Sequence, residues 1–195
     1  TDYSFIKDVE YILSGVVKVG NGNIAIASKA EYEAVVAAGV TLTVAAGTSI
    51  KGAADGVLLV TRGSKLIAEG TTFEPITFSS LDDNYDGMGE WGGVVIQGFA
   101  PQYGQGDTGA CFTLGEEWCN VLGEGGDFVQ EYGGSMAGDD SGSLRYVRIA
   151  EGGLIAGPNN EINGLTLQGV GHGTLVDYVQ VHGNQDDGRE GARAL

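Results

Sequence analysis

The chain has 195 residues, a formal net charge of -16, 42% hydrophobic residues and 35 glycines. This length suits one domain over residues 1–195, and the charge disfavours nucleic acid and anionic membrane surfaces as partners. Only 3 prolines accompany the glycines and no G-X-Y period occurs, which excludes a collagen-like chain and favours many short strands joined by glycine turns.

Residues 1–39 are predicted to form an N-terminal cap that contains the clearest helix of the sequence. Ser28 and Glu31 have the spacing of a capping box, and the alanine-rich stretch that follows predicts a helix over about 29–38. Gly39 can close this helix. Its apolar side is expected to pack on the first rungs of the following strands and consists of Tyr32, Val35 and Val36.

Short strands dominate from residue 40 onward, and one phrase recurs with a shift of sixteen residues. Residues 42–50 (LTVAAGTSI) return as residues 58–66 (LLVTRGSKL), each reading as a strand, a glycine corner and a second strand. Later apolar triplets follow at spacings of eighteen, such as Leu58, Ile76 and Val94. The pattern predicts a right-handed parallel β-helix, with a β-sandwich as the alternative.

Residues 100–140 interrupt the strands and are predicted to form one long inserted loop. No Lys or Arg occurs from Leu66 through Leu144, a stretch that holds fourteen acidic residues. Cys111 and Cys119 are eight apart, which predicts a local disulfide that pins the loop and an oxidising compartment, with two free thiols as the alternative. The loop aromatics either form a small core or stack on sugars, and the glycan-stacking candidates are Tyr103 and Trp118.

An acidic turn beginning at Asp82 matches D-x-N-x-D-G, the first half of a calcium loop. The twelfth position is Gly93 rather than Glu, so the pattern is not an EF-hand, and Glu90 is expected to supply an oxygen instead. The sequence thus predicts a structural Ca²⁺, with a solvated turn as the alternative. The predicted ligands are Asp82, Asn84, Asp86 and Glu90, and a weaker set is Asp186, Asp187 and Glu190.

Catalytic patterns are weak in this chain, which favours a non-enzymatic role. No pair of carboxylates stands out for hydrolysis, and neither histidine has a visible Ser or Cys partner. A lyase would need a base such as Arg145 or Arg148, but their odd separation predicts that they point to opposite faces of one strand. The expected partner of the solvent-facing one is Glu151 or Asp139.

Four segments together are similar to a family of exported bacterial cell-surface β-helix proteins with a pectate-lyase-like fold. They are residues 91–96 (WGGVVI), 141–149 (SGSLRYVRI), 160–167 (NEINGLTL) and 186–188 (DDG). The resemblance spans roughly residues 40–188 and implies a right-handed parallel β-helix and surface export. It implies no particular activity, because most such proteins have no assigned function.

These observations predict a non-catalytic extracellular surface protein with a structural, adhesive or filament-forming role. End-to-end stacking of β-helices is the expected mode of self-association, because an uncapped end exposes strand edges. The alternative is a calcium-dependent polysaccharide-binding or lyase-like module. The chain starts at Thr1 and has no run of eighteen apolar residues, which favours an exported protein with its signal peptide removed and no direct membrane insertion.

Overall fold

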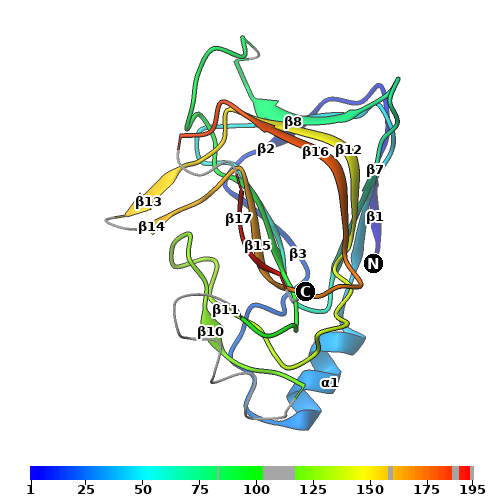
Figure 1. Cartoon of the computed structure of the whole chain (residues 1–195), viewed down its shortest axis with the longest axis vertical. Helices are drawn as coiled ribbons and strands as arrows, with labels where there is room; N and C mark the ends of the chain where they lie inside the picture. The colour runs from blue at the N-terminus through cyan, green and yellow to red at the C-terminus, as the bar shows by residue number, and fades with distance from the viewer. Residues whose placement is uncertain (83, 103–116, 158–159, 186–188, 194–195) are drawn as a thin grey trace.

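The computed structural model describes residues 1–82, 84–102, 117–157, 160–185 and 189–193. The strands of the two main sheets pair in parallel and wind through successive coils around a three-sided core (Figure 1). The predicted parallel β-helix is therefore confirmed, and the β-sandwich alternative is wrong. Right-handed winding stays a prediction.

Five successive coils supply the strands of the two main sheets. The first coil holds β1 (Tyr3–Phe5), β2 (Tyr11–Leu13) and β3 (Val16–Val19), and the second holds β4 (Thr41–Val44), β5 (Ser49–Gly52) and β6 (Val57–Val60). The third holds β7 (Lys65–Glu69), β8 (Ile76–Ser80) and β9 (Gly93–Gln97). The fourth holds β12 (Gly142–Ala150) and β15 (Leu165–Val170), and the fifth holds β16 (Leu175–His182) and β17 (Arg189–Arg193).

The register shows what the sixteen-residue repeat means. Leu42 pairs with Leu66 in the next coil, whereas its sequence counterpart Leu58 lies on another face of the same coil and pairs with Val94. The repeat therefore relates neighbouring faces rather than stacked rungs. The two copies still share one backbone, because their corner glycines, Gly47 and Gly63, have φ values of 76° and 77°. This left-handed corner favours glycine.

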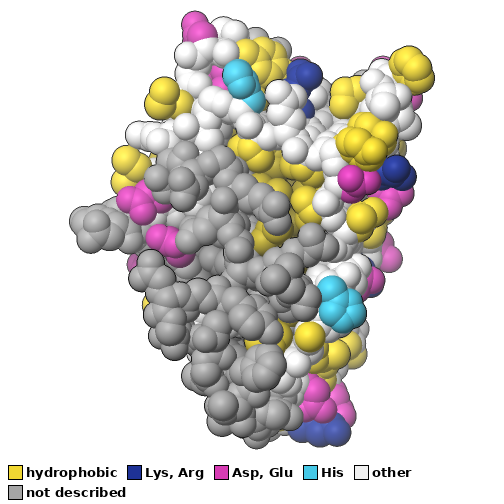
Figure 2. All heavy atoms as spheres, viewed as in Figure 1, with side chains coloured by type: hydrophobic (Ala, Val, Ile, Leu, Met, Phe, Trp, Pro, Cys, Tyr) yellow, Lys and Arg dark blue, Asp and Glu magenta, His cyan; other side chains and the backbone are white. Residues whose placement is uncertain are grey.

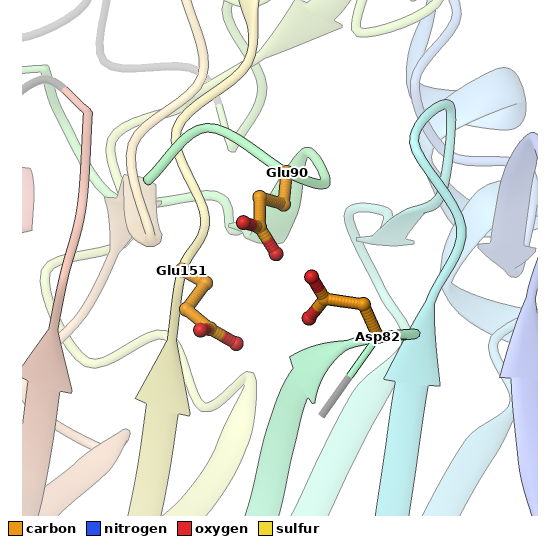
Figure 3. Close-up of side chains that lie close together, drawn as sticks. All are labelled: Asp82, Glu90 and Glu151. Carbon is orange, nitrogen blue, oxygen red and sulfur yellow. The ribbon is translucent and has the colours of Figure 1, made fainter. Parts of the chain in front are cut away.

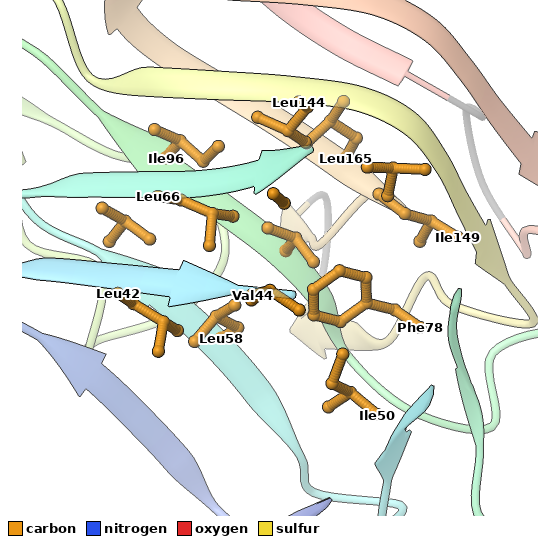
Figure 4. Close-up of a cluster of buried hydrophobic side chains, with 14 of the residues drawn as sticks. Leu42, Val44, Ile50, Leu58, Leu66, Phe78, Ile96, Leu144, Ile149 and Leu165 are labelled. Carbon is orange, nitrogen blue, oxygen red and sulfur yellow. The ribbon is translucent and has the colours of Figure 1, made fainter. Parts of the chain in front are cut away.

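The core consists of apolar rows stacked along the coils (Figure 4). One row joins Ile50, Phe78 and Ile149, which are register partners in β5, β8 and β12. All three side chains are fully buried. Each such side chain contributes about 1.5–3 kcal/mol through the apolar area it removes from water.

The outer face of β6 and β9 is buried as well, because residues 117–134 lie against it. Leu59 and Val95 point outward from the core yet form a second buried cluster, against which Phe128 packs. Gln97 Nε2 donates to Val129 O at 3.0 Å, and Gln168 Nε2 donates to Glu124 O at 2.8 Å. The described part of the predicted insertion is thus a packed layer on one side of the β-helix. It includes the hairpin of β10 (Val121–Leu122) and β11 (Glu131–Tyr132).

The helix α1 (Lys29–Ala37) begins at the predicted capping residue, because the Ser28 hydroxyl accepts from Glu31 N at 3.3 Å. The Glu31 carboxylate accepts from Ala27 N at 2.7 Å, one residue before the position that a capping box requires.

The predicted packing of this helix on the first rungs is wrong. Val35 packs with Ile26 and Phe99 in a separate cluster, and Val36 is 46% exposed. The helix lies beside one corner of the three-sided core rather than across its end (Figure 1). The physical reason is that the apolar side of α1 meets Phe99, which follows β9, and Trp118 of the inserted segment.

A single left-handed residue turns the corner within each of the last two strands of the larger sheet. Tyr146 has a φ of 48° and Tyr178 a φ of 52°, and their rings stack with centroids 4.5 Å apart. β12 can therefore pair with both β7 and β8 along its length. A second hairpin, β13 (Ile155–Gly157) with β14 (Asn160–Glu161), projects between β12 and β15 (Figure 1).

Candidate metal site

Three carboxylates gather where the loop of residues 81–91 meets the end of β12 (Figure 3). Each of Asp82, Glu90 and Glu151 offers an oxygen, and these three oxygens all lie within 4.8 Å of one another. Asp82 follows β8, Glu90 precedes β9 and Glu151 follows β12, so the group joins the third and fourth coils. Among the described residues, no other group of three His, Cys, Asp or Glu side chains brings its ligand atoms this close together.

Backbone bonds hold the loop and the corner together. Glu90 N donates to Glu151 O at 2.9 Å, and Gly89 N donates to Gly152 O at 3.0 Å. Glu151 has a left-handed φ of 63°, and its N–H donates to His182 O in the fifth coil. These bonds bring residues that are more than sixty positions apart in the chain to one place, with Glu151 fully buried.

Ser80 connects two of the three carboxylates. Its hydroxyl lies 2.7 Å from Asp82 Oδ1 and 2.8 Å from Glu151 Oε2. One hydroxyl proton can serve only one of these two oxygens at a time. The hydrogen bond from Ser80 holds the pKa of the Asp82 carboxyl below its usual value, while burial opposes that shift.

The remaining oxygens are poorly satisfied. Glu151 Oε1 and Glu90 Oε2 are buried and have no hydrogen-bond partner within the described part of the chain. A buried carboxylate oxygen without a partner is costly, because water no longer solvates its charge. This arrangement calls for a positive group at the centre of the three carboxylates.

Lys51 is a nearby cation that offsets part of the negative charge of the three carboxylates. Its ammonium donates to Ser79 Oγ at 3.0 Å and lies 5.9 Å from the centre of the Tyr85 ring. Burial lowers the pKa of Lys51, and Glu151, Glu10 and Asp82 act in the opposite direction. One ammonium offsets one of three carboxylate charges.

The predicted calcium ligands are brought together only in part. Asp82 and Glu90 meet as expected, but Asp86 is not in the three-carboxylate group. The Asn84 oxygen accepts from Asp86 N at 3.3 Å, and Asp82 Oδ1 accepts from Asn84 N at 3.4 Å, so these side chains stabilise the turn itself. The loop does not wrap all its oxygens around one point because the following residues run into β9 instead of a helix.

Sequence reasoning missed Glu151 as a ligand candidate. The signal available was an acidic residue between the end of β12 and two glycines, the sequence Ala150-Glu151-Gly152-Gly153. Such a position resembles the Asp-Gly corners elsewhere in the chain, and only the register of the coils places it beside residues 82 and 90.

The weaker metal set lies mostly outside the described residues. Asp186 and Asp187 are not described, and Glu190 lies in β17 without a described side chain. Cys111 and Tyr103 also lie outside the described residues, so the Cys111–Cys119 disulfide stays a prediction.

Trp118 belongs to the small core near α1. Its ring stacks on Tyr32 with centroids 5.7 Å apart, and Tyr32 meets Phe99 edge to face. This arrangement agrees with the interpretation of the loop aromatics as a local core. It leaves one face of Trp118 covered by Tyr32, which limits stacking on a sugar.

The two arginines of β12 both point outward, contrary to the expected opposite faces. Tyr146 breaks the alternation of the strand between them, because its left-handed backbone turns the corner there. Arg145 pairs with Asp177 at 3.5 Å, and Arg148 Nε donates to Gln180 Oε1 at 3.3 Å. The expected pairing of the exposed arginine with Glu151 or Asp139 is therefore wrong.

A family model described as a pectate-lyase like beta helix domain matches residues 20–191. The chain belongs to this family, in agreement with its parallel coils and with the predicted fold group. No curated protein and no solved structure matches the chain significantly. Among the described residues, no helix is long and apolar enough to span a membrane.

Proposed function

We propose that this protein is a non-catalytic extracellular surface protein with a structural or adhesive role, and that it associates end to end through its first coil. The family sets the β-helix scaffold and leaves the role of the individual protein open. The observation that carries the proposal is the uncovered inner side of that first coil.

Strands β1, β2 and β3 lie at the edges of the two main sheets. Tyr3 is 67% exposed, although it is the register partner of the buried Leu42. A cavity of about 490 Å³ opens beside it, lined by Phe5, Val17 and Leu42 among others. Apolar side chains that would stack on a further coil therefore face solvent within the described structure.

This end offers both parts of a β-helix interface. The edge strands carry backbone N–H and C=O groups that can pair with another strand, and the exposed apolar residues can continue the core. Ile6 and Ile12 add exposed apolar surface at the same coil, with exposures of 54% and 51%. A coil of a second molecule would cover the edge backbone groups and Tyr3 without any new fold.

The test is a charge placed on the open end of the core. Tyr3→Glu should abolish concentration-dependent association, because association would bury the new carboxylate. Leu122→Glu is the matched control, since Leu122 is 75% exposed in the inserted hairpin and makes the same change in net charge. Sedimentation velocity and electron microscopy of the natural mature protein measure the outcome.

Two results would contradict the proposal. The protein could remain monomeric at high concentration, or both glutamate variants could associate equally well. In either case the first coil would not be the contact surface.

A second candidate function is a polysaccharide-binding module, favoured by the exposed ring stack of Tyr146 and Tyr178. Tyr178 is 61% exposed, and the Arg145 guanidinium lies 5.8 Å from its ring centre. Aromatic rings beside a charged donor suit stacking on an anionic sugar. We expect Tyr178→Ala to remove any binding to uronate polymers in a pull-down, whereas Tyr85→Ala should retain it. Equal binding by both variants would dismiss the stack as the sugar site.

A further inference from the structure

We propose that Asp82, Glu90 and Glu151 bind a single Ca²⁺ ion, which fastens the loop of residues 81–91 to the corner after β12. The proposed site differs from the calcium loop expected from sequence, because it replaces Asn84 and Asp86 with a residue from the next coil. It concerns the stability of the β-helix and does not depend on how the protein associates.

Glu151 is buried at the centre of this group without full hydrogen bonding. Its side chain is fully buried, its carboxylate lies in the group (Figure 3), and its Oε1 has no hydrogen-bond partner among the described residues. Isolated buried carboxylates are avoided unless a cation or a proton neutralises them. Glu151 is therefore an independent sign that a positive ligand belongs at this point.

The group has an excess of negative charge. The three carboxylates carry three negative charges when ionised, and Lys51 supplies one nearby positive charge. A divalent ion neutralises the remaining two charges. Ser80 cannot do this, because its one hydroxyl proton is placed between Asp82 and Glu151.

Two glycines of the loop give the Glu90 side chain room to reach the group. A Cβ atom on Gly87 would lie 1.6 Å from Glu90 Oε1, so glycine at this position leaves room for the Glu90 carboxylate to turn inward. Gly89 likewise makes room for Gln185, since its Cβ would lie 1.8 Å from Gln185 Oε1. The loop is thus shaped to bring Glu90 close to Asp82 and Glu151.

Donor chemistry selects calcium. All three side chains offer hard carboxylate oxygens, and no His or Cys belongs to the group, which disfavours zinc. Calcium accepts irregular oxygen sites and completes its shell with water or backbone carbonyls, whereas Mg²⁺ demands a near-ideal octahedron. A site made from one loop and the corner of the next coil suits the more tolerant ion.

Acidic surface groups elsewhere do not share these features. Acidic side chains are scattered over the face seen in Figure 2, where they lie in contact with solvent. Asp140, for example, pairs with Lys65 at 2.5 Å and is half exposed. Glu131 Oε2 is also buried without a partner, but Glu131 belongs to no group of three such residues within the described part of the chain. The proposed site is set apart by the combination of unpartnered oxygens on Glu151 and Glu90 with a third carboxylate close by.

The experiment measures Ca²⁺ and Tb³⁺ binding to the chelator-treated protein at neutral pH. Trp91 follows Glu90 in the chain, and its indole N–H donates to Ala150 O beside Glu151, so its excitation should sensitise bound Tb³⁺. Calorimetry with Ca²⁺ should give one saturable site per chain. Added Ca²⁺ should displace Tb³⁺ and raise the unfolding temperature.

Three variants localise the site. Glu151→Gln and Glu90→Gln should each weaken Ca²⁺ binding by ~10-fold or more, since even the loss of an outer-shell partner costs ~10–100-fold. Asp86→Asn is the matched control, because Asp86 lies in the same loop outside the group, and it should bind as the wild type does. If Glu151→Gln fails to fold, Glu90→Gln still tests the Ca²⁺ site, since Glu90 is only partly buried.

The stability of Glu151→Gln relative to the wild type gives a second readout, because the difference should change sign between chelator and saturating Ca²⁺. In chelator, Glu151→Gln should be more stable than the wild type, because it removes one of three repelling charges. In saturating Ca²⁺ the order should reverse. The proposal is overturned if the wild type binds no Ca²⁺, if Asp86→Asn weakens binding as much as Glu90→Gln, or if the stability order does not change.

Discussion

Replacement of Arg62 by Met should destabilise the protein by about 3–5 kcal/mol, the range for breaking a buried charged network by removing one partner. Arg62 is fully buried, and its guanidinium donates to four backbone carbonyls: Gly22 O, Ile24 O, Cys119 O and Gly133 O. Methionine fills similar space but leaves these carbonyls without their donors.

The effect should be large because Arg62 joins three parts of the chain. It lies in the corner between β6 and β7, and its partners come from the segment before α1 and from the inserted layer. Burial lowers the pKa of Arg62 to about 10, and Glu131 partly offsets that shift, so the side chain still carries its charge at neutral pH. Its guanidinium also lies 5.4 Å from the Phe99 ring centre.

Urea unfolding compares Arg62→Met with Arg62→Lys and the wild type. Lysine keeps the charge but lacks the planar fork that reaches four carbonyls, so its loss of stability should be intermediate. Limited proteolysis should show earlier cleavage within residues 117–134 in the Met variant. A loss below about 1 kcal/mol, the net worth of one ordinary hydrogen bond, would show that the network has little weight.

Replacement of Trp91 by Ala should cost about 3–5 kcal/mol, as is usual for a large aromatic side chain removed from a core. Trp91 is fully buried, and its indole N–H donates to Ala150 O at 2.7 Å. Its ring lies directly over Gly52 in β5, where a Cβ atom would come within 2.5 Å of Trp91 Cε3. The loss has two sources, the empty space and the unpaired carbonyl.

A double-mutant cycle with Gly52 isolates the packing contribution. Gly52→Ala should destabilise the wild type, because the three nearest atoms to its new methyl group all belong to Trp91. In the Trp91→Ala background, the same methyl group should be neutral or stabilising, since it then fills part of the cavity. The coupling should exceed about 0.5 kcal/mol, the lower limit for residues in contact.

Trp91→Phe separates the hydrogen bond from the ring. Phenylalanine retains most of the packing and loses the bond to Ala150, so its cost should be about 1–3 kcal/mol. Additive effects of Trp91→Ala and Gly52→Ala in denaturant unfolding would show that the two residues do not press against each other.

Much of the fold can be predicted from local patterns of residues in the sequence. Apolar residues at every second position of short runs, with Gly47 and Gly63 at matching corners, are enough to predict strands and turns. The capping residue Ser28 fixes the start of α1 for the same reason, since it depends on neighbours three residues away.

The stacking partners depend on coil length, which no local pattern reveals. Leu42 lies against Leu66 and Leu58 against Val94, because the corners differ in length from face to face and from coil to coil. The sixteen- and eighteen-residue spacings relate residues on different faces of the β-helix rather than stacked partners. Only the folded three-sided core shows which residues of neighbouring coils stack on each other along the axis.

The sequence by itself determined the class of fold, the start of the helix and two of the three clustered carboxylates, because these depend on residues close together in the chain. Tertiary structure alone decided that Glu151 completes the group, that Arg62 is buried, and that α1 lies at a corner. Each of these depends on segments that meet only after the coils have stacked. Burial and charge pairing at such points arise from the packing of distant segments, and residue order does not encode that packing in any short motif.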